Sequence, residues 1–508
     1  MYKKRKHRER KFIMGVSDTN QVTKESKLLL WCFALGLLYD FMFFDTTFAG
    51  IAYPIFVVAV YGVFAWLFHS QGRLKPSFTF PWLLVALILL LSLTFVLFSN
   101  PAFLVLNFFL VHLLFVAHTM LVTGTHKRPW HHIGFLIEMA ERVTIHTLSN
   151  LLKPFSSVVR SRLMPSSVAI KVGLGIAITC PLLLVVIVLL SSADSIFLKY
   201  VIEIPKQLLD IDFGEIPAHI ILTTFITLIL FAYFWSLLHL TKESEPTGTS
   251  EEETRKPKKL DGVISVTILT MLNLVYVIFT AIQISFLFGG AESALPAGVT
   301  YSEYARQGFG EMLTVSFINI GVLLLLLHFA SQQKKGLYRA VQVLLTILTV
   351  CSLFILFSAF TRLTMYEQAY GFTLLRLLPQ AFMILLLSLF AVSLVRVWKS
   401  NVSLYKSYTI ITLVWLVALN YANLDLIIAK SNIQRYQQTG EIDLDYIGSL
   451  SYDVVPELAK LQKDPKIGDK AVAELKKMKS RLKFETKPEW QTFNFSRHRA
   501  EQIVKNIH

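Results

Sequence analysis

The chain has 508 residues, of which 54% are hydrophobic and 16% are charged, and its formal net charge at pH 7 is +15. A mean hydropathy of +0.55 excludes both an ordinary water-soluble domain and a disordered chain. The basic balance does not indicate nucleic-acid binding, because much of it lies in short segments between apolar runs, where anionic lipid headgroups would meet it. Composition therefore predicts a polytopic membrane protein and does not identify an activity.

Eleven long apolar runs predict eleven transmembrane helices, because about 20 apolar residues cross a bilayer as a helix. Only helices and closed barrels satisfy their backbone polar groups there. We therefore expect an all-α integral membrane protein with a small extracytoplasmic α-helical C-terminal domain. The predicted spans are residues 27–43, 46–69, 81–98, 101–123, 167–190, 217–240, 261–287, 308–330, 338–360, 375–397 and 405–423.

Charge and turn residues divide the chain into membrane and soluble segments. The expected order is a basic cytoplasmic N-terminus (1–26), four transmembrane helices (27–123), a cytoplasmic amphipathic segment (124–166), two transmembrane helices (167–240), a disordered cytoplasmic loop (241–260), five transmembrane helices (261–423) and an extracytoplasmic helical domain (424–508).

The distribution of lysine and arginine predicts the orientation in the membrane. The first eleven residues are strongly basic, and the apolar run behind them carries Asp40 and no small-residue cleavage site, which indicates a signal-anchor. Short segments on the opposite side carry few basic residues, as the positive-inside rule requires for a cytoplasmic N-terminus. The three cysteines all lie in predicted spans, so no disulfide framework is expected outside. These features predict a multi-pass protein of a bacterial plasma membrane with its C-terminus outside.

Two predicted outer loops, 288–310 and 361–376, are the most informative segments. Residues 300–306 (TYSEYAR) and 364–370 (TMYEQAY) both fit the Ser/Thr-x-x-Glu capping box that begins a helix. The second box predicts a helix from Met365 to Arg396, about 48 Å long and longer than the bilayer core. Both loops should then present helix N-termini outward, where free N–H groups and the helix dipole favour anions.

The residues around these helix starts suit a site for an anionic lipid headgroup, a polyprenyl phosphate or a phosphorylated polymer. Arginine supplies bidentate hydrogen bonds to phosphate, and tyrosine lines pockets at the membrane interface. The alternative is purely structural, because tyrosine and arginine are common interfacial anchors and the two glutamates can be capping residues. The candidate ligand-binding residues are Arg306, Arg362, Arg376, Tyr301, Tyr304, Tyr366, Tyr370, Glu303 and Glu367.

Metal and cofactor sites are not predicted. The histidines of segment 124–166 (His131, His132 and His146, with Glu138) match no common ligand spacing. In the tail, Asp443, Asp445 and Asp453 are better explained by helix starts and turns than by a paired-carboxylate site. We find no Walker loop, dinucleotide fingerprint, HExxH or GxSxG, so no cofactor is expected and an enzyme is the less favoured class.

Polar residues inside the spans leave three rival functions open. The amides Asn273, Gln283, Asn319, Gln380 and Asn420 are expected to form interhelical hydrogen bonds. A membrane-embedded transferase would use Glu303 or Glu367 as its base, and a secondary transporter would use Asp40 as its coupling group. An envelope sensor or scaffold would meet an extracytoplasmic protein partner through residues 424–508.

Several stretches resemble a known group of bacterial multi-pass membrane proteins. They are YSEYARQGFGEML, MYEQAYGFTLLRL, NIQRYQQTGEIDLDYIGSLSYDVVPEL, IFTAIQISFLFGG and WQTFNFSRHRA. The group is the family catalogued as domain of unknown function 4173, with its 4153 relatives, and the resemblance covers roughly residues 170–508. It implies a bacterial inner or cytoplasmic membrane protein and brings with it no activity, substrate or catalytic residue.

Overall fold

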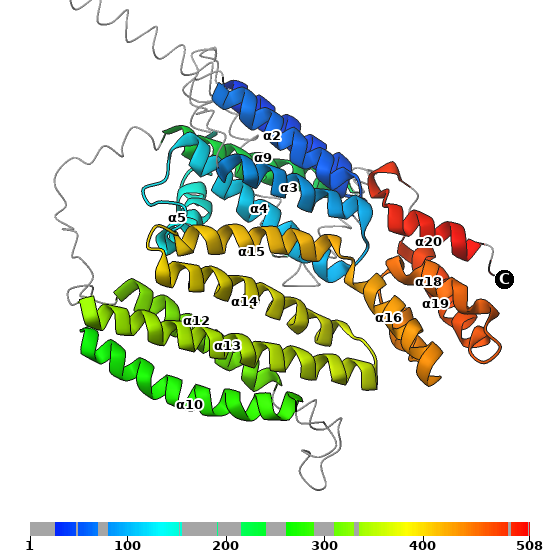
Figure 1. Cartoon of the computed structure of the whole chain (residues 1–508). Helices are drawn as coiled ribbons and strands as arrows, with labels where there is room; N and C mark the ends of the chain where they lie inside the picture. The colour runs from blue at the N-terminus through cyan, green and yellow to red at the C-terminus, as the bar shows by residue number, and fades with distance from the viewer. Residues whose placement is uncertain are drawn as a thin grey trace, which may run out of the picture. The chain divides into compact units, whose positions relative to one another are not determined.

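The computed structural model describes residues 26–46, 49–69, 80–151, 153–154, 190, 215–239, 261–288, 309–329, 335–485, 489–505 and 507 (Figure 1). These residues fold into helices without a β-strand, as the predicted all-α class requires. By length and composition, nine of the described helices could cross a membrane, and the number rises to ten if one bent pair of helices counts as a span. The predicted span 167–190 lies outside the described residues except for Leu190, so the number eleven stays a prediction.

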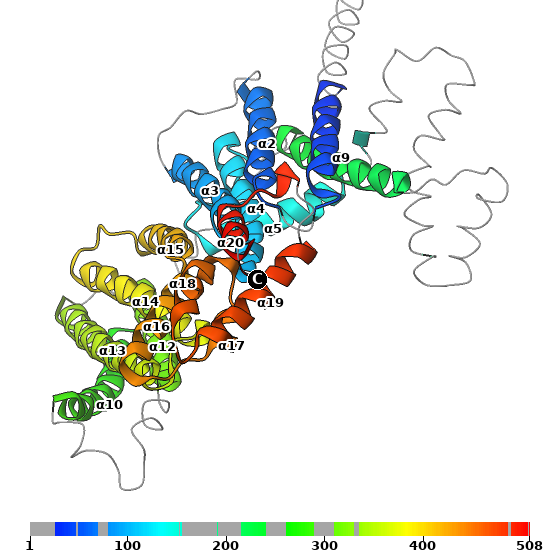
Figure 2. The same cartoon turned by 90° about the vertical axis from the view of Figure 1, so that its right-hand side faces the viewer.

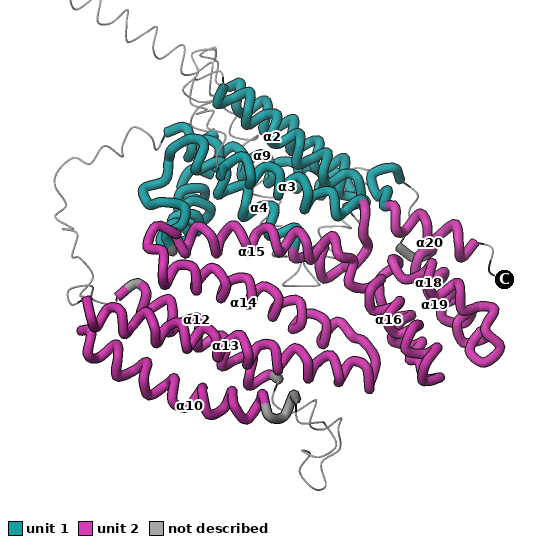
Figure 3. Tube along the Cα trace, viewed as in Figure 1, with its two compact units in different colours: residues 1–96, 107–245, 485–494 teal, residues 97–106, 246–484, 495–508 magenta. Residues whose placement is uncertain are grey.

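The chain divides into two compact units, coloured separately in Figure 3. Unit 1 comprises residues 1–96, 107–245 and 485–494, and unit 2 comprises residues 97–106, 246–484 and 495–508. The segment from the end of α3 (Phe80–Leu97) through the first residues of α4 (Pro101–Thr123) therefore belongs to unit 2, together with most of the C-terminal helices. This assignment matters for the site, because that segment and those helices share hydrogen bonds.

Unit 1 is built from apolar helices around an aromatic core. Phe64, Phe68, Phe231 and Phe234 are completely or almost completely buried, and the rings of Phe64 and Phe234 lie 6.3 Å apart. Besides most of α3, its helices are Ser26–Phe43, α2 (Ala52–His69), α4 (Pro101–Thr123) from Asn107 onward, α5 (Ile133–Glu141), the π-helix η1 (Arg142–His146) and α9 (Ile216–His239).

The first helix, Ser26–Phe43, lies against α9 at a glycine. A Cβ added to Gly36 would come within 2.3 Å of Thr227 Oγ1 and 2.7 Å of the Thr223 carbonyl oxygen. A small residue at such a crossing lets two membrane helices approach closely, which supplies packing that apolar surface alone does not supply in lipid. This contact explains why the helix tolerates a glycine in its interior.

Within the predicted amphipathic segment 124–166 the structure contains α5 and η1, and residues 155–166 of that segment lie outside the described residues. Phe135 and Met139 are buried against unit 1, whereas Leu136 and Ile137 are each more than half exposed. The segment therefore presents apolar side chains in two directions, as a helix does when it packs on protein on one side and meets lipid on the other.

Unit 2 contains a layer of long membrane helices arranged around α13 (Lys335–Tyr370). α13 contacts α10 (Gly262–Phe288), α12 (Phe309–Phe329) and α14 (Leu374–Trp398), and α14 contacts α15 (Leu404–Tyr421). Figure 2 shows α10, α13, α14 and α15 following one another in that order. Two apolar clusters fill the layer, one around Ile355, Leu386 and Phe390 and one around Leu269, Leu345 and Leu348.

The buried amides of this layer hold helices together, as the sequence predicts. Asn273 Nδ2 donates to the Leu344 carbonyl at 2.9 Å, and Asn319 Nδ2 donates to Ser352 Oγ at 2.8 Å. Gln380 Nε2 donates to Thr364 Oγ1 at 3.0 Å. Each bond joins α13 to a neighbouring helix, and such bonds are a main source of association between helices in lipid.

The predicted start of a helix at Met365 is wrong. α13 continues without a break through residues 364–367 and ends at Tyr370, and α14 begins at Leu374. The reason is Gly371, whose φ of 86° lies in the left-handed region and whose N–H donates to the Glu367 carbonyl at 2.8 Å. A left-handed glycine is the usual C-terminal stop of a helix, so it ends α13 four residues beyond the supposed capping glutamate.

A sharp bend of 56° separates α15 from α16 (Leu424–Thr439). Asn423 forms it with a φ of 52°, a conformation that asparagine tolerates better than most residues, and its side chain accepts a hydrogen bond from the Leu426 N–H. The helices that follow are α17 (Leu444–Ser449), η2 (Tyr452–Val454), α18 (Val455–Lys460), η3 (Leu461–Lys463), α19 (Gly468–Glu485), η4 (Trp490–Thr492) and α20 (Phe495–Lys505).

The helices α16 to α20 share one hydrophobic cluster of their own. It includes Ile447, Val455, Leu458 and Leu475, which are fully buried. The aromatic residues Trp490 and Phe495 do not belong to this cluster, and they are 53% and 56% exposed. In α20 the inward face is formed by Arg497, Ala500 and Val504, and Phe495, at the first position of the helix, lies off that face.

We predict that Gly371→Ala destabilises the protein by about 1–2 kcal/mol, because an alanine is strained in the left-handed region. Its Cβ would also lie 2.7 Å from Asn432 Oδ1. The thermal unfolding midpoint of the purified protein in nanodiscs should fall. Gly321→Ala is the control, since a Cβ there meets nothing within 4 Å and α12 should be unaffected or slightly stabilised. Equal midpoints for the two variants would contradict this role of Gly371.

Candidate functional site

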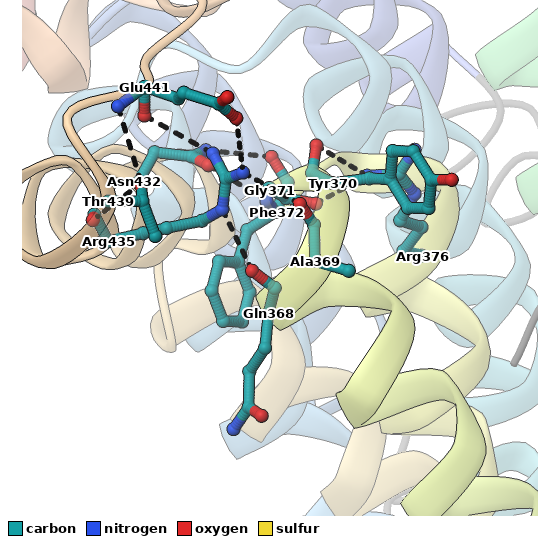
Figure 4. A network of polar contacts seen from close by, with 10 residues as sticks. All are labelled: Gln368, Ala369, Tyr370, Gly371, Phe372, Arg376, Asn432, Arg435, Thr439 and Glu441. Atoms are coloured by element: carbon teal, nitrogen blue, oxygen red, sulfur yellow. Dashed lines mark hydrogen bonds and ion pairs between the residues drawn. The ribbon is translucent and has the colours of Figure 1, made fainter. Parts of the chain in front are cut away.

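The turn between α13 and α14, residues 370–374, is the best-defined polar site among the described residues. Figure 4 shows two arginines converging on the last carbonyls of α13. Arg435 of α16 donates from Nε to the Gln368 carbonyl at 2.8 Å and from Nη2 to the Ala369 carbonyl at 2.7 Å. Arg376 donates from Nη1 to the Tyr370 carbonyl at 3.2 Å and also to the Gly371 carbonyl. The two cations thus satisfy carbonyls at a helix end that carries partial negative charge.

Other side chains of the C-terminal helices form hydrogen bonds with the backbone of this turn. Asn432 accepts from the Phe372 N–H through Oδ1 and donates to the Phe372 carbonyl through Nδ2, both at 2.8 Å (Figure 4). The Leu374 N–H, at the start of α14, donates to the Tyr446 hydroxyl at 2.9 Å. We call Asn432, Arg435 and Tyr446 the latch, because together they attach α16 and α17 to the α13–α14 turn.

Both described candidate arginines have partners within the protein. Arg376 stacks on the ring of Tyr366 with its guanidinium carbon 4.3 Å from the ring centre, a cation–π contact. Arg362, two helical turns before the end of α13, donates from Nη2 to Gln283 Oε1 of α10 at 2.9 Å. Ser358 donates to the same oxygen at 2.8 Å, so Arg362 belongs to a small polar group between α10 and α13.

Glu367 is the residue whose surroundings differ most from expectation. It is 1% exposed, and neither of its carboxylate oxygens has a hydrogen-bond partner. Since α13 does not begin at Thr364, Glu367 is not a capping residue, and it lies instead in the last turn of the helix. The Gln380 side chain and the Arg376 guanidinium are near enough to influence its charge. A buried carboxylate without a partner in a membrane helix marks a functional site by default.

The structure brings five of the nine candidate ligand-binding residues together. Arg362, Tyr366, Glu367, Tyr370 and Arg376 all lie on the last turns of α13 or the first turn of α14. The rings of Tyr366 and Tyr370 are 5.0 Å apart, and Tyr370 is 54% exposed. The other four candidates, Tyr301, Glu303, Tyr304 and Arg306, lie outside the described residues.

Sequence reasoning missed the latch. Asn432 and Arg435 are about sixty residues from the turn that they contact. They lie on α16, whose limits are explained by its own capping residues Asn423 and Gly440 and so indicate no distant partner. The signal that could have found them is Gly371, since a helix stop there exposes carbonyls that need donors from elsewhere.

A second polar cluster fixes the turn between α3 and α4 to the same C-terminal helices. Asp453 Oδ2 accepts from the Ser99 N–H and from Ser99 Oγ, both at 2.9 Å. Asp425 Oδ2 accepts from Asn100 Nδ2 at 2.9 Å and from the Ser451 N–H at 3.1 Å. Each of these carboxylates therefore has protein donors on its Oδ2 atom, although Asp425 Oδ1 has no hydrogen-bond partner.

The other acidic residues considered for metal binding have separate partners. Asp443 caps α17 by accepting from the Tyr446 N–H at 2.9 Å. Asp445 pairs with Lys477 at 3.3 Å. Within the described part of the chain, no group of three or more metal-ligating side chains converges.

Asp40, the residue singled out for a transporter, forms a hydrogen bond with His219 in unit 1. Its Oδ2 lies 2.8 Å from His219 Nδ1, and the imidazole stacks on Phe44 with ring centres 3.7 Å apart. Asp40 is near the end of its helix and His219 is in the first turn of α9. The pair is therefore located toward the helix ends and away from the middle of the spans.

We predict that Asn432→Ala loosens the α13–α14 turn, because two backbone groups of Phe372 lose their partner at a cost of about 1–3 kcal/mol. Hydrogen–deuterium exchange of peptides covering residues 366–378 should become faster in the full-length protein in nanodiscs. The exposed Gln437 of the same helix provides the control, as Gln437→Ala should leave exchange there unchanged. Unchanged exchange in Asn432→Ala would show that the latch does not stabilise the turn.

Comparison with known proteins identifies a family without a described function. A family model described as a domain of unknown function, DUF4153, matches residues 85–461. This match supports the 4153 relatives named above and does not confirm the number 4173. It begins earlier than the resemblance drawn from motifs, and it ends before the WQTFNFSRHRA stretch. No curated protein and no solved structure matches the chain.

Proposed function

Because the chain belongs to the DUF4153 family, a domain of unknown function, we propose from its geometry what this polytopic membrane protein does. We propose that it binds a lipid-type ligand with an anionic phosphate headgroup where α13 meets α14. The observation that carries the proposal is Arg376, a cation held by Tyr366 and by the end of α13 at the edge of a membrane-helix layer.

Positive charge gathers at this end of unit 2. Arg362, Arg376 and Arg435 lie on the last turns of α13, the first turn of α14 and the facing side of α16. Glu441 pairs with Arg435 but is itself 77% exposed, so water screens its charge. Arginines that are fixed by stacking and carbonyl contacts keep donors in a set geometry, which favours bidentate binding of phosphate.

Apolar residues beside the arginine would accommodate the rest of a lipid. Leu375, immediately before Arg376, is 84% exposed, and Tyr370 is 54% exposed. An exposed leucine and tyrosine at a helix end are typical of the membrane–water interface, where aromatic rings lie at headgroup level. A phosphate on Arg376 would thus bring its hydrocarbon chain beside side chains that already face lipid.

The orientation predicted from charge places this end outside the cell. With the basic N-terminus in the cytoplasm, the α13–α14 turn and the C-terminal helices face the extracytoplasmic side of a bacterial plasma membrane. The ligand would then be a phospholipid headgroup of the outer leaflet or a lipid-linked phosphate.

The latch supports a second candidate function, an envelope sensor or scaffold. α16 and α17 contact the proposed ligand end directly through Asn432, Arg435 and Tyr446. A ligand on Arg376 would lie next to helices that could present a surface to an extracytoplasmic protein partner. A transferase or a transporter receives no comparable support from the described contacts.

We expect Arg376→Ala to weaken phospholipid retention about ten-fold or more, since a charge-assisted hydrogen bond contributes about 1.5–3 kcal/mol. Native mass spectrometry of the protein in nanodiscs containing phosphatidylglycerol and phosphatidylethanolamine would measure the bound lipid. Arg339→Ala is the matched control, because Arg339 is exposed in the first turns of α13, at its opposite end.

Arg376 also caps α13, so the folded state of its variants must be checked by their thermal unfolding midpoints. Arg376→Gln, which keeps hydrogen-bond donors for the carbonyls and loses the charge, is a second variant. Equal lipid retention by wild type and by folded Arg376 variants would refute the proposed function. A scaffold without a lipid ligand would tolerate these variants and fail when the latch is removed.

A further inference from the structure

We infer that Glu367 binds an ammonium group of the ligand, so that the ligand class is a phosphate lipid that carries a primary amine. This inference rests on the proposed function and names the chemistry of the headgroup. Arg376 would hold the phosphate, and Glu367, one turn further into the bundle, would hold the amine.

The environment of Glu367 is unfavourable for a carboxylate and favourable for a cation beside it. The side chain is 1% exposed and both of its oxygens are without hydrogen-bond partners. It also lies in the last turn of α13, where the helix dipole is negative and destabilises a further negative charge. A cation bound there would relieve both the missing hydrogen bonds and the unfavourable dipole.

The nearby arginines do not supply that cation. The Arg376 guanidinium is directed at the carbonyls of Tyr370 and Gly371 and at the Tyr366 ring. Arg435 donates to the Gln368 and Ala369 carbonyls and pairs with Glu441. Both cations satisfy the backbone and leave the carboxylate of Glu367 unpaired, so a positive group from a ligand would complete the site.

The acceptors around Glu367 suit a primary ammonium, which has three donors in a compact group. Gln380 of α14 reaches the neighbourhood of Glu367, and its Nε2 is directed at Thr364 Oγ1. The acceptors that an ammonium would meet here are the two oxygens of the Glu367 carboxylate, with the Gln380 amide beside them. Arg376 and Gln380 are four residues apart and so lie on one face of α14.

These positions predict how a zwitterionic headgroup would bind. The negative phosphate would lie at the positive Arg376, and the positive ammonium would lie at the negative Glu367. Electrostatic complementarity of this kind provides specificity. A site built around a charged partner discriminates strongly against an analogue that lacks it, because the buried group is then left unpaired.

The test compares two lipids that differ only at the amine, phosphatidylethanolamine and its N-acetylated form. Full-length protein in nanodiscs that contain each lipid would be examined by native mass spectrometry. Wild type should retain phosphatidylethanolamine at least about ten-fold better. Glu367→Gln, which keeps the size and loses the charge, should retain both lipids equally. Glu311→Gln is the matched control, because Glu311 is an exposed carboxylate in the first turn of α12 and the preference should persist.

The outcomes separate this inference from the proposed function. Loss of the amine preference in Glu367→Gln, with phospholipid still bound through Arg376, supports both. Retention of both lipids without preference by wild type overturns the amine site and leaves phosphate binding intact. A preference that survives in Glu367→Gln also overturns the role of Glu367. Failure of wild type to retain either lipid refutes the proposed function together with this inference.

Discussion

At the end of a membrane hairpin, the last carbonyl groups of the first helix find no donors within the hairpin's helices and need them from elsewhere. Much of unit 2 depends on which residues supply these donors around Gly371. Four carbonyls, from Gln368 to Gly371, receive hydrogen bonds from Arg376 and Arg435. One arginine comes from the hairpin itself and the other from α16, so the turn is complete only when the C-terminal helices are in place. At a membrane edge, where unsatisfied backbone groups cost several kcal/mol, this requirement connects helices that are far apart in sequence.

The same principle explains why the C-terminal helices belong to unit 2. They contact the α13–α14 turn through the latch, and they hold residues 97–106 through Asp425 and Asp453. In both places the C-terminal helices contribute polar side chains, and the turns contribute polar groups that include backbone N–H. The arrangement gives Asp425 and Asp453 a structural role, and among the described residues it leaves Glu367 as the buried carboxylate with no hydrogen-bond partner on either oxygen.

Much of the architecture follows from the sequence because lipid imposes simple rules. Apolar runs of about 20 residues predicted the membrane helices, and the polar amides Asn273, Asn319 and Gln380 predicted bonds between them, which the structure contains. Both results depend on local composition and on the absence of water as a competing partner. The site was harder to predict, since it depends on where one helix stops.

The error at residues 364–367 illustrates this difficulty. Thr364 and Glu367 have the spacing of a capping box, but the same spacing occurs by chance inside a helix, and Gly371 four residues later is the stronger signal. The local motif also could not indicate that Thr364 bonds to Gln380 or that Arg435 approaches the turn. Contacts of that kind depend on the packing of helices, which no short pattern encodes.

The latch has a consequence for how the chain is made. Residues 335–380 leave the ribosome and enter the membrane well before Asn432, Arg435 and Tyr446 have been synthesised. During that interval the carbonyls of Gln368 and Ala369 and both backbone groups of Phe372 must rely on water, so the hairpin first folds with its tip hydrated. The arrival of α16 then replaces water with protein donors, which makes closure of this turn a late step of biogenesis.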